Sequence, residues 1–382
     1  MDKKVILRCR VLTPTEITAP SSIWIEQGKI VKVEHEKSSN IPDDYQIIDG
    51  DGQLLIPGMV DVHIHGAGGC DMMDGTEESI LEVSRICAMT GCTSFLATSV
   101  TSSLEDLTKM INNVKKVIGR EPGAKIVGIH LEGPYLNVKR KGMQDENNLR
   151  HPDLAEMKEI LKQADGLIKM VTIAPELPGG IEMVQFLKEQ GIIVSLAHSD
   201  ATYEQAKQAF AIGASHVTHC FNAMRPIHHR DPGLVVAAFE EPHVSLQAIV
   251  DNVHLHPAVV RLMHRIKGPA GIALITDALQ AMYMGDGTYD FGGHQVTVSN
   301  GVARLNDGTL ASSTVTMDQA LCNTVESGIS LVDAVHMAST TPASILGLKD
   351  KGNILTGADA DLVLIDSNYT IQWTMINGQL IN

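Results

Sequence analysis

The 382-residue sequence is short of basic residues. Lysine and arginine number 30 against 45 acidic residues, which gives a formal net charge of -15 with histidine neutral. No stretch of lysine and arginine forms the basic stripe that is typical of proteins binding nucleic acid or anionic membranes. We therefore expect neither nucleic acid nor a membrane as a partner.

The N-terminal stretch lacks a long apolar run. The first eleven residues, MDKKVILRCRV, contain only three consecutive apolar residues before Arg8. A signal peptide or a transmembrane start needs a longer run. We therefore expect a cytoplasmic protein.

Paired cysteines and low-complexity tracts are also missing. The six cysteines lie far apart, without the CxxC spacing of a zinc ribbon or the density of a secreted disulfide scaffold. They are Cys9, Cys70, Cys87, Cys92, Cys220 and Cys322. We expect buried free thiols. A hydrophobic content of 44% without low-complexity segments indicates a folded globular protein with a substantial core.

Both ends of the chain alternate apolar and polar residues between turn signals, which is the pattern of β-strands. The N-terminal part contains VILRCRVL, SSIWIEQGKIVKVE and YQIIDGDGQLLIP, and the C-terminal part contains GADADLVLIDSNYTIQWTMINGQLIN. Neither part has a helical period. We predict a small β-sandwich domain built from residues 1–55 together with residues 350–382.

Eight short apolar runs recur between the two ends, each followed by polar residues or glycine. They are DVHIHG, TSFLATSVTS, KIVGIHLEGP, IKMVTIAPE, GIIVSLAHSD, ASHVTHCFN, VSLQAIVDNVH and GIALITDAL. Successive runs end about 30 residues apart, which is the length of a strand, a crossover helix and two loops. Segments such as SLEDLTKMINNVKKVIG between the runs have helical spacing. We predict a (β/α)₈ TIM-like barrel over residues 56–349.

A doubly wound open sheet also alternates strands and helices and is the main alternative. The position of the polar residues favours the barrel. Nearly every run has a chemically reactive group at its C-terminal end, and a barrel brings all eight of these ends around one pocket. An open sheet would distribute them along one edge.

The stretch MVDVHIHGAG places two histidines one residue apart. Side chains two apart in a strand point to the same side, so Asp61, His63 and His65 share one face while Val60 and Val62 share the other. If the apolar face packs on helices, both imidazoles reach the mouth of the barrel, where a divalent metal can accept them. The glycines that follow let the chain turn away at this point.

A histidine pair by itself is more often packed or exposed than bound to metal. Here, four further ligand-type residues stand at the ends of later runs: Glu132, His198, His219 and Asp277. Six such residues at strand ends of one barrel favour a metal centre. A structural zinc site is disfavoured, because these ligands are spread over more than 200 positions of the sequence and the protein already has a large core.

The motifs PGMVDVHIHG, HLEGPY, LAHSDA, THCFNAM and ITDA resemble those of the N-acetylglucosamine-6-phosphate deacetylase family, within the metal-dependent amidohydrolase superfamily. The resemblance spans essentially the whole chain, including the split β domain. It implies a barrel enzyme of amino-sugar catabolism that hydrolyses the 2-acetamido group of N-acetyl-D-glucosamine 6-phosphate to D-glucosamine 6-phosphate and acetate.

The resemblance also implies the metal ligands. It assigns His63 and His65 to one ion and His198 and His219 to another, with Glu132 bridging the two or anchoring a single ion. Imidazole and carboxylate suit zinc, iron, manganese and cobalt alike, so we expect one or two divalent ions of any of these metals. Such an ion would activate water and polarise the amide carbonyl. Asp277 would take the proton of the water and return it to the departing amine.

Substrate contacts follow from the same resemblance. It places Asn222, Ala223 and Arg230 near the sugar and its phosphate, His254 near the acetamide and hydroxyls, and Leu310, Ala311, Ser312 and Ser313 over the sugar ring. Arg230 has the planar donor fork that suits phosphate oxygens. In relatives the corresponding arginine reaches a neighbouring subunit, so the resemblance implies a homodimer.

Two stretches depart from the family pattern. Relatives read KGAH and LAGS where this chain reads KGMQ and LASS, which puts Met143 and Gln144 in place of a small residue and a histidine, and Ser312 in place of glycine. We expect a shifted sugar preference or a slower enzyme. The alternatives are a deacetylase of another phosphorylated N-acetylhexosamine such as N-acetylgalactosamine 6-phosphate, an amidohydrolase of ring amides, or a catalytically silent relative.

Overall fold

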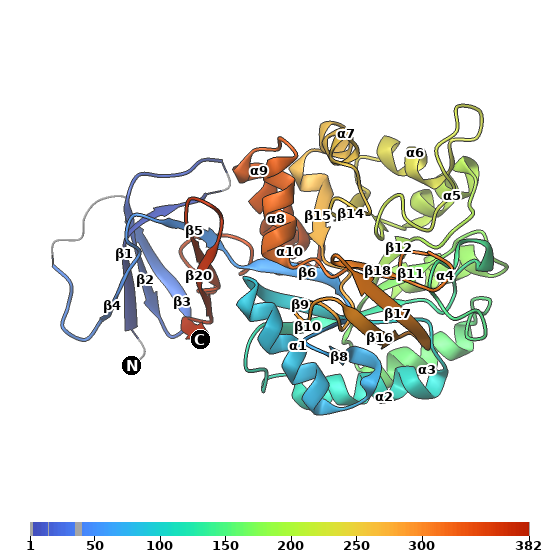
Figure 1. Cartoon of the computed structure of the whole chain (residues 1–382), viewed down its shortest axis with the longest axis horizontal. Coiled ribbons are helices and arrows are strands. Elements are labelled where there is room, and N and C mark those ends of the chain that lie inside the picture. Colours follow the sequence, from blue (N-terminus) through green and yellow to red (C-terminus); the bar gives the residue numbers. More distant parts are fainter. Residues whose placement is uncertain (1–2, 14, 35–39, 382) are drawn as a thin grey trace.

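The computed structural model describes residues 3–13, 15–34 and 40–381, and it shows two parts side by side (Figure 1). One part is built from strands of both chain ends. The other is a parallel barrel surrounded by helices, so the predicted fold class is confirmed.

Strands from both chain ends form one eight-stranded sheet in the order β21-β20-β19-β5-β1-β2-β3, with β4 paired to β1. The strands are β1 (Lys3–Val11), β2 (Ser21–Glu26), β3 (Lys29–Glu34), β4 (Gln46–Asp49), β5 (Leu54–Pro57), β19 (Leu362–Ile365), β20 (Ile371–Ile376) and β21 (Gln379–Ile381). The antiparallel pair of β5 with β19 joins the N-terminal strands to the C-terminal ones. The predicted boundaries at residues 55 and 350 stay a prediction, and residues 1–2, 14, 35–39 and 382 lie outside the described residues.

A β-bulge in β1 separates the part of the strand that pairs with β4 from the part that pairs with β5. The register shifts between Ile6 and Cys9, where Arg8 has φ +56°, a conformation typical of bulges. Before the bulge β1 pairs with β4, and after it with β5. One apolar cluster joins residues from both sides, including Ile23 of β2 and Leu364 of β19, as in a β-sandwich.

The eight predicted runs become the eight parallel strands of the barrel. They are β6 (Met59–Ile64), β9 (Cys92–Ser99), β10 (Lys125–Glu132), β11 (Ile168–Ile173), β12 (Ile193–Leu196), β13 (His216–Val217), β14 (Ser245–Ile249) and β15 (Ile272–Ile275). Hydrogen bonds beyond the regular ladder close the ring between β15 and β6. The backbone N–H of Asp277 donates to His63 O at 2.8 Å, and that of His65 donates to Ala278 O at 2.9 Å.

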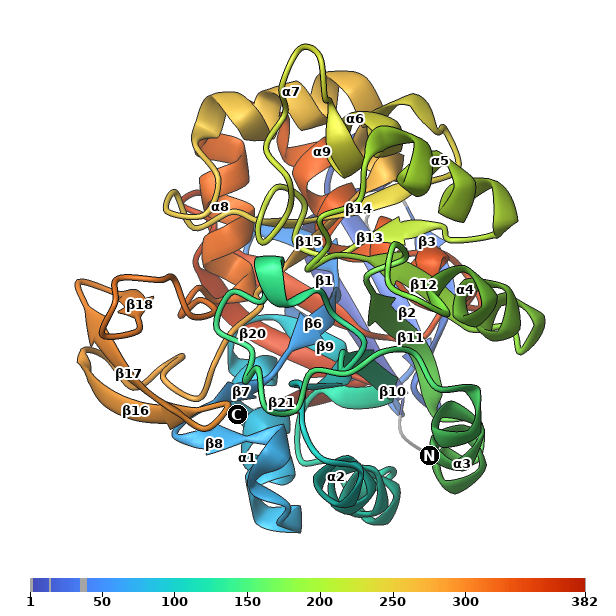
Figure 2. The ribbon, with the colours of Figure 1, turned by 90° about the vertical axis from the view of Figure 1, so that its right-hand side faces the viewer.

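One helix follows each barrel strand, and these helices surround the barrel (Figure 2). They are α1 (Glu77–Met89), α2 (Leu104–Val117), α3 (Leu154–Ala164), α4 (Gly180–Glu189), α5 (Tyr203–Ile212), α6 (Gly233–Glu240), α7 (Pro257–Lys267) and α8 (Met317–Glu326), with α9 (Leu331–Val335) and α10 (Thr341–Ile345) completing the chain before β19. The predicted packing of the apolar face of β6 is confirmed, because Val60 and Val62 share a buried cluster with Ala320 of α8 and Ala343 of α10.

Side-chain caps start several of these helices. In α2, Ser103 accepts the backbone N–H of Asp106, and Lys115 and Lys116 occupy the last turn. In α5, Thr202 and Gln205 form a reciprocal capping box. Such caps satisfy backbone donors that the helix itself leaves free, and they place each loop above its strand.

Two additions stand at the ends of β6 and β15. The glycine turn after β6 forms the short strands β7 (Gly66–Ala67) and β8 (Cys70–Asp71), and a Cβ on Gly66 would lie 2.4 Å from Cys70 O. Between β15 and α8 a three-stranded sheet lies at one side of the barrel (Figure 2): β16 (Gly287–Phe291), β17 (His294–Ser299) and β18 (Val302–Arg304). The barrel pattern did not predict this sheet.

The cysteines are free, and Cys9, Cys87, Cys92 and Cys220 are buried as expected, whereas Cys70 and Cys322 are half-buried. Within the described ranges, we find no helix whose length and apolar character would let it cross a membrane.

Candidate active site

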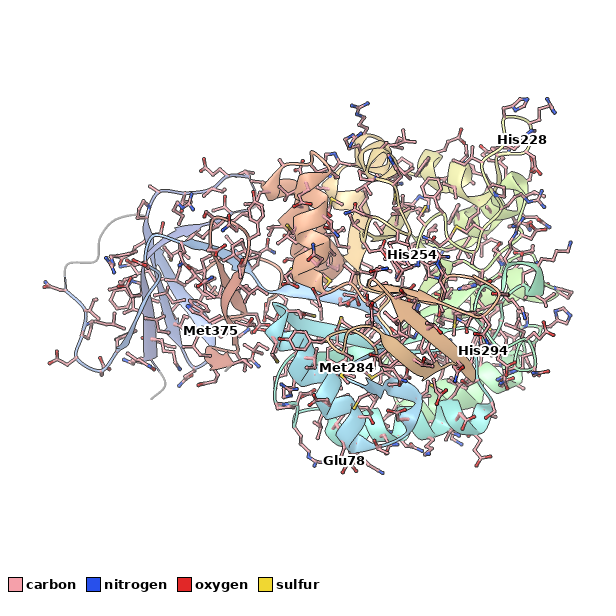
Figure 3. All side chains as sticks on the ribbon, viewed as in Figure 1. Glu78, His228, His254, Met284, His294 and Met375 are labelled. Atoms are coloured by element: carbon pink, nitrogen blue, oxygen red, sulfur yellow. The ribbon has the colours of Figure 1, made fainter. Side chains whose placement is uncertain are left out.

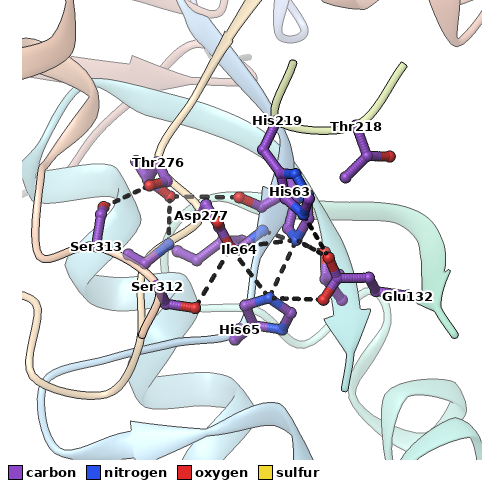
Figure 4. Close-up of polar contacts among 12 residues, drawn as sticks. His63, Ile64, His65, Glu132, Thr218, His219, Thr276, Asp277, Ser312 and Ser313 are labelled. Atoms are coloured by element: carbon purple, nitrogen blue, oxygen red, sulfur yellow. Dashed lines mark hydrogen bonds and ion pairs between the residues drawn. The ribbon is translucent and has the colours of Figure 1, made fainter. Parts of the chain in front are cut away.

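His63 of β6 and His65, the residue directly after that strand, meet Asp277 at the mouth of the barrel (Figure 4). The Nε2 atoms of His63 and His65 lie 3.0 Å apart. Asp277 Oδ1 lies 3.3 Å from His63 Nε2 and 3.2 Å from His65 Nε2. All three side chains are buried, so their ligand atoms face one another rather than solvent.

Glu132 joins this group to a second one. Its Oε1 lies 3.2 Å from His198 Nε2 and 2.9 Å from His219 Nε2, and those two nitrogens are 3.1 Å apart. The same carboxylate faces the first group, because Oε2 lies 3.5 Å from His65 Nε2. Glu132 therefore forms one cluster with His198 and His219 and faces the other, made of His63, His65 and Asp277. Each cluster could hold a metal ion.

Backbone conformation turns three of these side chains into the mouth. His198, His219 and Asp277 each lie two residues past the end of a strand and have φ values of +45°, +29° and +47°. Residues other than glycine rarely adopt this left-handed region, and such strain concentrates at functional sites.

Hydrogen bonds to Nδ1 determine which nitrogen of two histidines faces the centre. His63 Nδ1 donates to Gln247 Oε1 at 3.0 Å, and His198 Nδ1 donates to the Arg140 carbonyl at 2.9 Å. Because both acceptors are oxygens that carry no hydrogen, each neutral ring holds its proton on Nδ1 and keeps a lone pair on Nε2. This is the tautomer of a histidine whose Nε2 binds metal.

The pKa values of His63 and His65 are shifted in opposite directions, because burial dominates for His63 and the nearby carboxylates dominate for His65. Burial lowers the pKa of His63 to about 4. Burial also disfavours the charged form of His65, but Asp277 and Glu132 outweigh it and raise the pKa of His65 to about 9. Burial alone would raise the pKa of Glu132, yet His63, His198 and His219 hold it well below its usual range. The carboxylates therefore stay ionised at neutral pH.

The donor atoms fit divalent metal ions. Two ligands at about 2.0–2.1 Å from a tetrahedral ion lie about 3.3 Å apart, close to the distances observed within each cluster. Nitrogen lone pairs as near as those of His63 and His65 repel each other unless a proton or a cation lies between them. Imidazole with carboxylate is a ligand set of zinc, iron, manganese and cobalt.

A cavity of about 390 Å³ opens above these residues, within the range of small-molecule sites. It is lined by Glu132, Gly142, Met143, Gln144, His198, His219, Asn222, Ala223, His254, Asp277, Arg304, Gly308, Thr309, Leu310 and Ser312. His63 and His65 do not line it but contact Asp277 and Glu132, which do. His254 is held by its Nδ1, which lies 2.6 Å from Asp251 Oδ2.

Three predicted substrate contacts lie outside this lining. Ala311 is buried in an apolar cluster, and Ser313 donates from Oγ to Thr276 O at 2.5 Å, so both support the loop from behind. Arg230 is exposed, with Nη1 2.7 Å from His229 Nε2. Arg230 lies two residues after His228. Figure 3 shows His228 on a projecting loop, whereas His254 lies nearer the middle of the barrel part.

Gln144 and Ser312, one from each departing stretch, both contact carboxylates of the candidate site. Gln144 donates from Nε2 to Glu132 Oε2 at 2.6 Å and accepts the Thr101 N–H at 2.8 Å. Ser312 has φ +56° and directs Oγ to Asp277 Oδ1 at 3.4 Å. Gln144 therefore orients the central carboxylate, a role that the spacing alone did not predict.

Sequence reasoning missed Gln247, Glu176 and Arg304. Gln247 is a fully buried amide within β14, a polar residue in an apolar run, and this was the available signal. Glu176 follows β11 in the stretch APE, and Arg304 ends β18 at the rim of the cavity. Neither has a local pattern that distinguishes it from a surface charge.

The chain belongs to the amidohydrolase family, whose sequence model matches residues 54–381. Its sequence is 38% identical to the N-acetylglucosamine-6-phosphate deacetylase of Lysinibacillus sphaericus over 94% of this chain and 92% of that protein. It is 35% identical to the N-acetylgalactosamine-6-phosphate deacetylase of Escherichia coli O157:H7 over 98% of each.

A solved structure agrees with this assignment. An N-acetyl-D-glucosamine-6-phosphate deacetylase mutant from Mycobacterium smegmatis, in complex with N-acetyl-D-glucosamine-6-phosphate, superposes with a TM-score of 0.94 at 34% identity and 100% coverage of both chains. The family resemblance predicted from the motifs is thereby confirmed.

Proposed function

We propose that this amidohydrolase removes the acetyl group of N-acetyl-D-glucosamine 6-phosphate, yielding acetate and D-glucosamine 6-phosphate in amino-sugar catabolism. The observation that supports it most is the convergence of six residues in two adjoining clusters, four of which line one cavity: Glu132, His198, His219 and Asp277 line it, and His63 and His65 contact them. The whole-length similarity to deacetylases of phosphorylated N-acetylhexosamines supports the substrate class.

The chain's own residues account for binding and proton transfer. His63, His65, Glu132, His198 and His219 would hold a divalent ion, which when bound would supply Lewis-acid polarisation of the carbonyl and an activated water. Asp277 accepts the proton of the water at Oδ1 and delivers it to the amine nitrogen. Ser312, beside that oxygen, orients the carboxylate. His254 and Asn222, both in the cavity lining, are placed to hold the sugar.

Metal removal tests this proposal directly. We expect acetate release from N-acetylglucosamine 6-phosphate to stop after dialysis against a chelator and to return when zinc, iron, manganese or cobalt is added. Metal analysis of the purified protein then identifies the ion and shows whether one or two are bound. Undiminished turnover in a protein shown to be metal-free would contradict the proposal.

N-acetylgalactosamine 6-phosphate is the second candidate substrate. Gln144 and Ser312, which both contact catalytic carboxylates, are the features that favour a shifted preference. The two hexosamines differ only in the configuration of one hydroxyl, so kcat/KM for both substrates under the same conditions decides between them.

We further propose a homodimer in the cytoplasm. The loop that includes Arg230 and the exposed Ile227 projects from the barrel, as expected of a segment that reaches a second subunit. Light scattering coupled to size exclusion measures the mass. A monomer at assay concentration would exclude a contribution of Arg230 to a neighbouring site.

A further inference from the structure

Four polar side chains form a connected chain of hydrogen bonds inside the barrel. Ser195 Oγ of β12 lies 2.6 Å from Thr218 Oγ1, which lies 2.7 Å from Thr172 Oγ1 of β11. Thr172 Oγ1 lies 2.7 Å from His130 Nε2 of β10. All four side chains are fully buried. Branched apolar residues usually fill the interior of such barrels, so packing alone does not explain a polar chain at this place.

The backbone carbonyl of Val62 sets the direction of every hydrogen bond in this chain. It lies 3.1 Å from His130 Nδ1 and can only accept. A neutral His130 therefore carries its proton on Nδ1 and accepts at Nε2, so Thr172 donates to it. Because each hydroxyl has one hydrogen, Thr218 then donates to Thr172, and Ser195 donates to Thr218.

Both halves of this chain adjoin a candidate metal ligand. Val62, the final acceptor, directly precedes His63, and the rings of His130 and His63 pack edge to face with centroids 4.7 Å apart. Thr218 directly precedes His219 (Figure 4). Because His63 and His219 belong to different clusters, the chain connects a ligand of each cluster.

We propose that this chain of hydroxyl groups and imidazole holds the two clusters at the spacing that a metal ion requires, with Thr172 as its central positioning residue. The inference rests on the proposed function and deepens it. Without the Thr172 hydroxyl, His130 lacks the donor that fixes its ring and Thr218 lacks its acceptor, so His63 and His219 are held less firmly. Groups that orient metal-bound histidines affect ion affinity strongly.

The zinc affinity of three variants tests this inference. Thr172→Val keeps the shape of threonine without its hydroxyl, and Thr172→Ser keeps the hydroxyl. Thr324→Val is the matched control, because this buried hydroxyl donates to Ala320 O within α8. We expect Thr172→Val to bind zinc about 10-fold more weakly than the native protein, and the other two to stay within about twofold of it. Competition with a chromogenic chelator, at a temperature where every variant is folded, measures these affinities.

Two results would overturn the inference. One is the same zinc affinity in Thr172→Val and Thr324→Val while thermal unfolding shows both to be destabilised, which would give the hydroxyl a role in folding alone. The other is an equal loss of affinity in Thr172→Val and Thr172→Ser, which would assign the effect to side-chain packing. If Thr172→Val does not fold, Thr172→Ala compared with Thr172→Ser decides, because these two also differ by one hydroxyl.

Zinc binding separates this inference from the proposed function, because it needs no turnover. A native protein that binds zinc but releases no acetate contradicts the proposed reaction, while the variants still decide the positioning role. A native protein that releases acetate, with equal zinc affinity in all variants, keeps the proposed function and overturns the inference. A native protein that binds no zinc, iron, manganese or cobalt contradicts both.

Discussion

At the scale of single residues, Gln247 links the two halves of the candidate metal centre. Its Oε1 accepts His63 Nδ1–H at 3.0 Å and the backbone N–H of His219 at 3.2 Å, so one buried oxygen positions a residue of each cluster. Its Nε2 is directed to Met170 Sδ at 3.6 Å, which leaves the oxygen toward the histidines. Partners of metal-bound histidines affect affinity strongly.

Replacing Gln247 with leucine should weaken metal binding about 10- to 100-fold, because His63 loses the acceptor that orients its ring. Gln247→Glu keeps an acceptor at the same place and should bind metal more tightly than the leucine variant. Equilibrium competition with a chromogenic chelator measures both. Equal metal affinity in the two variants would show that the hydrogen bond has no positioning role.

Asp277 is expected to act in proton transfer rather than only in metal binding. In Asp277→Asn the amide keeps an oxygen beside His63 and His65 but cannot accept a proton. We expect kcat to fall about 10²- to 10⁴-fold while metal content and substrate affinity remain. Metal analysis and substrate binding by calorimetry accompany the kinetics. Loss of metal together with activity would instead assign Asp277 a ligand role.

At the scale of elements, one carboxylate ties together the loops after β10, β11 and β12. Glu176 Oε1 accepts Asn137 Nδ2–H at 2.8 Å and the backbone N–H of Asp200 at 2.6 Å. Its Oε2 accepts Ser199 Oγ–H at 2.8 Å. Asn137 in turn donates from its backbone to the carbonyl of His198 at 2.9 Å, so Glu176 supports the loop that carries a candidate metal ligand.

Removing this brace should affect both stability and activity. Glu176→Ala leaves three donors without their acceptor, so we expect the free energy of unfolding to fall by at least about 1.5 kcal/mol. Movement of His198 should reduce kcat/KM about 10- to 100-fold. Glu182→Ala, an exposed carboxylate on α4, is the control for denaturant unfolding and acetate release. Matching behaviour of the two variants would refute the role.

At the scale of the whole molecule, ion pairs help to join the two chain ends. Lys29 Nζ on β3 lies 2.6 Å from Asp359 Oδ1, and Lys351 Nζ lies 3.0 Å from Asp359 Oδ2. Burial tends to raise the pKa of Asp359, but these lysines outweigh it and hold the pKa below the ordinary value. The ionised carboxylate is therefore the form that stabilises the fold.

The stability of this part should fall in acid. Because the folded pKa of Asp359 lies below the unfolded one, its contribution is complete above the unfolded pKa of 3.8 and is lost as the pH falls through the folded pKa. We expect Asp359→Asn to cost about 1–3 kcal/mol at pH 7 and progressively less below pH 4.

Tryptophan fluorescence can follow this transition selectively. The chain has two tryptophans, Trp24 on β2 and Trp373 on β20, and both belong to the sheet of the chain ends. Urea titrations between pH 3 and pH 7 give the difference between native and variant. A difference that does not change with pH would contradict the assigned pairing.

Much of the barrel, and the meeting of the candidate metal ligands at its mouth, could be predicted from the sequence. Period-two alternation places His63 and His65 on one face of a strand, and parallel strands bring Glu132, His198, His219 and Asp277 to the same mouth. These are local patterns combined with one rule of topology. They required no knowledge of how loops fold.

The remaining features depended on tertiary contacts. The absence of Arg230 from the cavity lining, the position of Arg304 at its rim, and the contacts of Gln144 and Gln247 with candidate metal ligands come from loops and buried amides. A loop conformation results from contacts with residues far away in the sequence, so no local periodicity encodes it. The sequence by itself determined which strands form the barrel and which reactive groups follow them. Only the packed structure decided which atoms those groups face.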